Sequence, residues 1–185
     1  MANQSLADSI AVVFQELGEY EFETDDKDQE TLKSLAEVLE FKVDRLGWDV
    51  PPEIWGARID WKSISYVRLL EIVGVNPVVA LMSMPKFPMQ SSGLSGLITM
   101  TEGWDIKEED IADGDTMENW HGRKADHIKA KEIATITLQT LDGKTFVVTK
   151  YRGEEGVVAD MYSGDDYKQS KQRILIAAVR RIIGV

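Results

Sequence analysis

The chain contains no cysteine, and this absence excludes disulfide bonds, thiolate metal sites and a thiol nucleophile. A chain without cysteine fits a reducing compartment. No signal peptide and no apolar run long enough to cross a bilayer is recognisable, so a cytoplasmic protein without membrane contact is expected. With 185 residues, 43% of them hydrophobic, the chain is predicted to fold as a single domain.

Basic residues are scarce: 21 Lys and Arg face 32 Asp and Glu, which gives a formal net charge of −11. The acidic excess lies in two blocks, residues 1–60 with a net charge of −10 and residues 101–130 with −5. Because nucleic-acid binding needs basic residues that displace counterions from phosphates, direct nucleic-acid binding is not expected. The charge is compatible with a basic protein partner.

The sequence matches none of the familiar catalytic and cation-binding motifs, because each lacks a required residue at a specific position. The sequence 143–145 ends like a phosphate-binding loop, but Leu138 stands where that loop needs its first glycine. Around Gly114, a calcium loop would place Ile111 and Trp120 at ligand positions that need oxygen atoms. No nucleophile, base and orienting group can be assembled from the sequence. The sequence therefore favours a non-enzymatic protein without a cofactor, although carboxylate-based catalysis would leave no spacing signature.

Apolar spacing predicts several amphipathic helices. The predicted helices are 6–17, a helix from its cap Asp28 to Leu46, 64–73 after Ser63, a short helix from Asn76-Pro77 to Met84, and a C-terminal helix capped by Asp165 or Asp166. The acidic stretch Glu19 to Glu30 is expected to be a loop.

Alternating and β-rich runs predict the strands 55–61, 96–102 and 157–162, and a hairpin of 133–141 and 144–151. Asp142-Gly143 suggests a two-residue type I′ turn in that hairpin. Because hairpins dominate the second half, we expect an α+β fold: an antiparallel sheet of about four or five strands with helices packed on one face. This single domain would comprise a helical part, about 1–50, and a sheet-containing part, about 51–185.

Three segments carry a resemblance to a known group of proteins. They are Leu46–Trp55, Met100–Trp104 and Ile136–Phe146. Together they resemble small acidic proteins of unknown function from actinobacteria and their phages. The resemblance implies such an origin, and it transfers no activity and no catalytic residue.

Candidate interaction residues are aromatic and acidic. Most of the five tryptophans are expected in the core, but Trp48 beside a proline pair and Trp120 in an acidic segment are expected to be partly exposed. Asp25, Asp26 and Asp28 belong to an acidic run that could imitate the phosphates of DNA.

A divalent-cation site is a second candidate. Glu118 and His121 lie three residues apart, a spacing that metal ligands on a helix use, and Asp113 and Asp115 are close in sequence. A solvated polar loop is the default interpretation of this segment.

The leading hypothesis is a binding or accessory protein that acts through protein contacts. Its partner would be a basic protein, or a second copy of the chain in a homodimer. One alternative is an acidic decoy for a DNA-binding protein, which predicts that both acidic blocks share one face. Another is a divalent-metal-dependent hydrolase that uses the segment 113–127.

Overall fold

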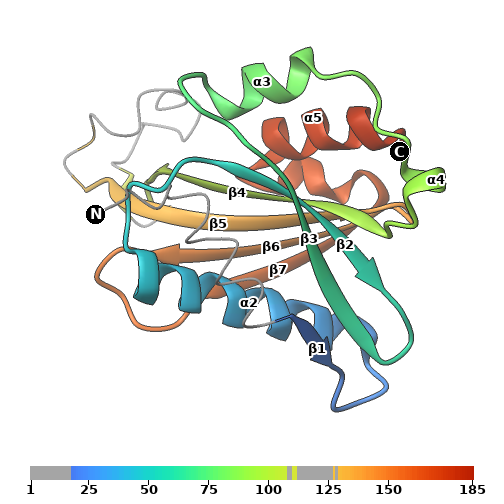
Figure 1. Cartoon of the computed structure of the whole chain (residues 1–185). Coiled ribbons are helices and arrows are strands. Elements are labelled where there is room, and N and C mark those ends of the chain that lie inside the picture. Colours follow the sequence, from blue (N-terminus) through green and yellow to red (C-terminus); the bar gives the residue numbers. More distant parts are fainter. Residues whose placement is uncertain (1–17, 108–109, 112–126, 128) are drawn as a thin grey trace, which may run out of the picture.

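A single antiparallel sheet of seven strands organises the protein (Figure 1). The computed structural model describes residues 18–107, 110–111, 127 and 129–185. The strands are β1 (Glu19–Glu21), β2 (Glu53–Ile59), β3 (Ser63–Glu71), β4 (Gly96–Asp105), β5 (Lys131–Thr140), β6 (Lys144–Tyr151) and β7 (Val158–Ser163). Their order across the sheet is β1-β3-β2-β4-β5-β6-β7, and all neighbours pair antiparallel. The α+β class is confirmed, but four or five strands was too few.

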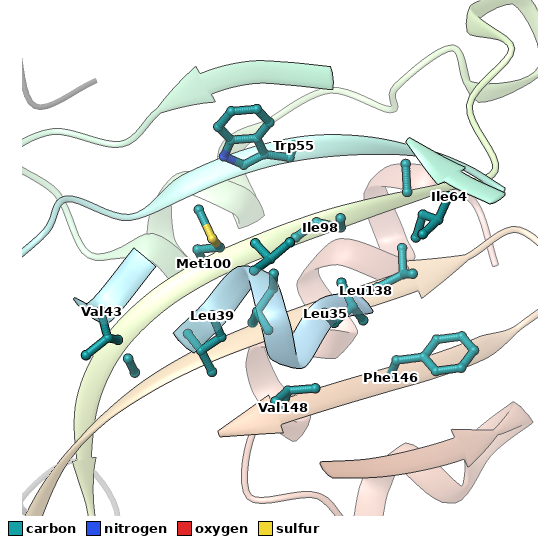
Figure 2. Close-up of a cluster of buried hydrophobic side chains, with 14 of the residues drawn as sticks. Leu35, Leu39, Val43, Trp55, Ile64, Ile98, Met100, Leu138, Phe146 and Val148 are labelled. Atoms are coloured by element: carbon teal, nitrogen blue, oxygen red, sulfur yellow. The ribbon is translucent and has the colours of Figure 1, made fainter. Parts of the chain in front are cut away.

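The long helix α2 (Lys27–Leu46) covers one face of the sheet. It begins at Asp26, whose side chain accepts a hydrogen bond from the Gln29 backbone N–H, so the predicted cap at Asp28 was two residues late. Figure 2 shows Leu35, Leu39 and Val43 of α2 pointing towards the strands, onto side chains such as Ile98 of β4 and Leu138 of β5. This predicted amphipathic helix is therefore confirmed, and burial of its apolar face holds it on the sheet.

The opposite face is also covered, by α3 (Pro77–Ser83), α4 (Met89–Ser92) and α5 (Arg173–Ile183). Figure 1 shows α3 stacked over α5, on the side of the sheet away from α2. The expectation of helices on one face was wrong because the strands are apolar on both faces. Leu97 packs in the α5 cluster while its neighbour Ile98 packs under α2, as successive side chains in a strand must.

Residues 63–71 form strand β3, where a helix over 64–73 was predicted. The apolar residues Ile64, Val67 and Leu70 suit a helical stripe, but Asp60 caps a tight turn that reverses the chain into a hairpin with β2. The segment 19–21 also differs from expectation, since it forms β1 and pairs with residues 63–65.

The β5–β6 hairpin is confirmed, but its loop has three residues, 141–143, in place of two. Gly143 adopts φ 87° and its N–H donates to the Thr140 carbonyl at 3.2 Å, the geometry of a turn followed by a left-handed glycine. A strand near 157–162 is confirmed as β7. Asp165 and Asp166 lie in a 3₁₀ helix (Gly164–Gln169), and α5 begins only at Arg173, after Gln172.

The predicted helix 6–17 lies outside the described residues. Among the described helices, none has the length and apolar character required to cross a membrane.

Candidate binding surface

The described surface has an acidic groove beside the turn between β2 and β3. Its volume is about 600 Å³, and it lies between the segment 19–25 and the turn 60–63. β1 brings the two together, because Glu19 pairs with Ser65 and Glu21 with Ser63. We call this hollow the Trp61 groove, after the tryptophan in its wall.

Asp60 fixes the shape of the turn. Its carboxylate accepts hydrogen bonds from the backbone N–H groups of Lys62, at 2.7 Å, and Ser63, at 2.8 Å. These hydrogen bonds lower the pKa of the Asp60 carboxyl. The Ser63 hydroxyl in turn donates to Glu19 at 2.5 Å, which ties β1 to the turn.

Glu30 holds the second wall of the groove, the segment 19–25, opposite the turn 60–63. Its carboxylate accepts hydrogen bonds from the Glu23 backbone N–H at 3.2 Å, the Thr24 hydroxyl at 3.1 Å and the Tyr20 hydroxyl at 3.2 Å. The bond from Glu23 is the main reason that the pKa of Glu30 is lowered. One carboxylate in the first turns of α2 therefore anchors the acidic segment to the helix.

Trp61 is the most exposed large apolar side chain in the described part of the protein, at 75%. Five acidic residues line the groove around it: Glu19, Glu21, Glu23, Asp25 and Asp60. The lining also contains Lys62, whose ammonium lies 4.2 Å from the centroid of the Trp61 ring. The ring thus already holds one cation of the chain itself, and Lys33 forms an ion pair with Glu23 at 2.7 Å. The five carboxylates still outnumber these two ammonium groups, so the groove keeps a negative charge that favours a basic partner.

The structure separates the predicted acidic residues by role. Asp25 lines the Trp61 groove, whereas Asp26 caps α2. Asp28 forms an ion pair with Lys144 of β6, with both carboxylate oxygens 2.7 Å from the ammonium. Only Asp25 of the three therefore faces the candidate site.

Trp48 lies at the opposite end of α2, half-buried, with the Arg152 guanidinium 5.5 Å from the centroid of its ring. Trp120 lies outside the described residues. Trp55 is buried as expected, but Trp61 and Trp104, at 75% and 46% exposure, were wrongly placed in the core. The signal that could have revealed Trp61 is the sequence Asp60-Trp61-Lys62-Ser63, which has a turn-forming aspartate directly before the tryptophan.

A carboxylate cluster near Trp48 is the candidate cation site in the described part of the chain. Asp49, Glu102 and Glu132 each contribute one carboxylate oxygen, and these three oxygens lie within 4.8 Å of one another. Cationic side chains are already present there: the Lys42 ammonium lies 3.5 Å from Glu102, and Arg152 donates to Glu132. These charges compensate the carboxylates, so we interpret the cluster as an ion-pair network.

Beneath this cluster lie two buried ionisable groups. Burial lowers the pKa of the Lys42 ammonium, although the Glu102 carboxylate opposes the shift. Burial likewise raises the pKa of the Glu53 carboxyl, despite a 2.9 Å hydrogen bond from the Trp55 indole N–H. Glu53 also accepts a 3.1 Å hydrogen bond from Arg68, so both buried charges have partners of opposite sign.

The metal site predicted at Asp113, Asp115, Glu118 and His121 lies outside the described residues, as does most of the second acidic block. Whether the two acidic blocks share a face therefore stays a prediction. No protein-family model matches the chain, and neither a curated protein nor a solved structure matches it.

Proposed function

We propose that this protein is a non-enzymatic binding protein that acts through protein contacts, and that the Trp61 groove is its contact surface for a basic partner. The observation that carries the proposal is an indole with 75% exposure set among five carboxylates. Large aromatic side chains supply much of the binding energy at protein interfaces, and complementary charge accelerates association and selects the partner.

The groove is also pre-organised. Asp60 and Glu30 hold its two walls through backbone and side-chain hydrogen bonds, so little ordering would be needed on binding. The partner that fits is a protein segment that offers Lys or Arg to the carboxylates and an apolar or cationic side chain to the ring of Trp61.

The test uses a labelled peptide of alternating lysine and leucine as probe, with fluorescence anisotropy as readout. We expect the full chain to bind this peptide and Trp61→Ala to weaken binding by roughly tenfold, the effect of losing a central aromatic contact worth more than 1 kcal/mol. Removal of two groove charges, in Glu21→Gln with Asp25→Asn, should weaken binding and reduce its salt dependence.

The matched control removes two exposed charges elsewhere, in Glu155→Gln with Asp166→Asn. If the control weakens binding as much as the groove variant, net charge alone drives the interaction and the Trp61 groove is not the site. The same comparison with partner proteins captured from the native host would identify the natural ligand.

A further inference from the structure

The last strand of the sheet has an open edge. In the described part of the protein, β7 pairs with β6 on one side and has no strand on the other. Five of its six residues are exposed, among them Val158 at 52% and Met161 at 41%. β7 contains no proline and no lysine, its one charged residue is Asp160, and its register with β6 runs without a shift. It therefore has few of the features that commonly protect an edge strand from pairing with another chain.

The direction of the backbone groups in β7 follows from the neighbouring hairpin. The Gly164 N–H donates to the Gly143 carbonyl at 3.1 Å and so continues the pairing of β7 with β6 by one residue. Because the backbone groups of successive residues in a strand point to alternate sides, the even-numbered residues of β7 bond to β6. The N–H and C=O groups that point away from the sheet belong to Ala159, Met161 and Ser163.

We propose that a second copy of the chain adds its own β7 to this edge, antiparallel and around a two-fold axis, so that the two sheets join into one. Such a closed pair is the commonest form of protein dimer. This inference goes beyond the Trp61 groove, which belongs to a different part of the surface.

The backbone decides the register of the two strands. Hydrogen bonds form only where outward-pointing residues face one another, and two registers meet this condition while pairing five residues of each strand: one centred on Asp160 and one centred on Met161. The first brings two carboxylates directly opposite each other, which is destabilising, and leaves Ser163 outside the paired strands. The second pairs Met161 with its own copy and Ala159 with the second copy's Ser163, so every outward residue is hydrogen-bonded. The strand is thus complementary to itself.

The side chain of Met161 supports the same axis. Met161 pairs with Phe146 of β6, whose side chain packs in the cluster under α2, so Met161 lies on the α2 face of the sheet. Two such side chains that meet across the axis would bury apolar surface that is now exposed. The other edge of the sheet is less suitable, because β1 carries Glu19 and Glu21 in its three residues.

Sedimentation equilibrium of the full chain is the first test. The interface is small and each copy carries a net charge of −11, so we expect a weak monomer–dimer equilibrium that strengthens several-fold between about 50 mM and about 500 mM NaCl. Peptide binding to the Trp61 groove should respond to salt in the opposite direction, so the two proposals can fail separately. A chain that stays monomeric at about 1 mM protein in the higher salt would overturn the dimer.

Two lysine variants locate the axis. Met161→Lys places two ammonium groups opposite each other and should weaken dimerisation at least about tenfold. Val158→Lys adds the same charge at a similarly exposed position of the same strand, three residues from the axis, and should change the dissociation constant less than about twofold. Equal weakening by the two variants would show that the strands do not meet at Met161.

A thiol crosslink tests the register independently. Because the chain has no cysteine, Met161→Cys carries its only thiol. The Cα atoms of a hydrogen-bonded antiparallel pair lie about 5.5 Å apart, within the range of a disulfide, whereas the two copies of Val158 would lie about 20 Å apart. Mild oxidation should therefore give a covalent dimer from Met161→Cys in several-fold higher yield than from Val158→Cys. Equal yields from the two variants would overturn the proposed axis.

Discussion

The backbone N–H of Asp49 donates a 2.6 Å hydrogen bond to the carboxylate of Glu102, 53 residues further along the chain. The Val50 N–H donates to the other carboxylate oxygen at 3.2 Å. Through these two bonds β4 holds the loop that follows α2. The loop is held in an unusual backbone conformation, since Asp49 has φ 70°, in the left-handed region that favours glycine.

The Asp49→Gly variant should be more stable than Asp49→Ala by about 1 kcal/mol, because only glycine adopts the left-handed conformation without strain from a Cβ atom. The substitution also removes one of three neighbouring carboxylates while keeping the N–H that binds Glu102. The measurement is the free energy of unfolding in urea. Asp49→Ala removes the same carboxylate but keeps the strain, so a stability equal to that of Asp49→Gly would contradict the explanation.

The buried Lys42 and its partly buried partner Glu102 should be energetically coupled. Lys42→Met leaves the Glu102 carboxylate without its nearest cation and should cost about 3 kcal/mol, the usual effect of removing one partner of a buried pair. In combination with Glu102→Gln the loss should be smaller than the sum of the two single losses by about 1 kcal/mol or more. A double-mutant cycle measured by urea unfolding checks this, and additive losses would show that the charges do not interact.

Two threonines that pair across neighbouring strands each have a buried hydroxyl without a hydrogen-bond partner among the described residues. Thr99 of β4 pairs directly with Thr137 of β5, both are buried, and neither hydroxyl has a partner among the described residues. Thr137→Val should therefore raise the free energy of unfolding by about 1 kcal/mol, because it removes an unsatisfied polar group without changing the volume much. The hydroxyl of Thr135, on the same strand, lies 3.4 Å from that of Thr149, so Thr135→Val should bring no such gain.

Acid should loosen the wall of the Trp61 groove through Glu30. Because the folded pKa of Glu30 is lowered, the unfolded chain takes up this proton first as the pH falls. The stabilisation is complete above the ordinary carboxyl range and is lost as the pH falls through the lowered folded pKa. Glu30→Gln should thus melt at a lower temperature than the parent protein at pH 7, and the difference should shrink on acidification. The exposed Glu37→Gln on the same helix is the control, and a difference independent of pH would refute this role.

Local signals made much of the fold predictable. Asn76-Pro77 marks the start of α3, the apolar stripe marks α2, and the β-rich runs around Asp142-Gly143 mark the hairpin, since each depends on neighbouring residues. Strand β3 was missed because Ile64, Val67 and Leu70 have helical spacing. In the strand, Ile64 packs in the cluster under α2 and Val67 against the cluster under α5, and only the pairing with β2 reveals this arrangement. Sequence reasoning missed the Trp61 groove for the same reason: residues 19–25 and 60–63 meet only through pairing of β1 with β3.

The length of α2 also limits how a partner can engage the protein. Asp25 and Trp48 stand just beyond the two ends of this 20-residue helix, which is about 30 Å long. An extended peptide needs about nine residues to cover that distance. Shorter peptides can therefore engage only one end of the helix. In a series of peptides of increasing length, affinity should rise once a peptide is long enough to contact both ends.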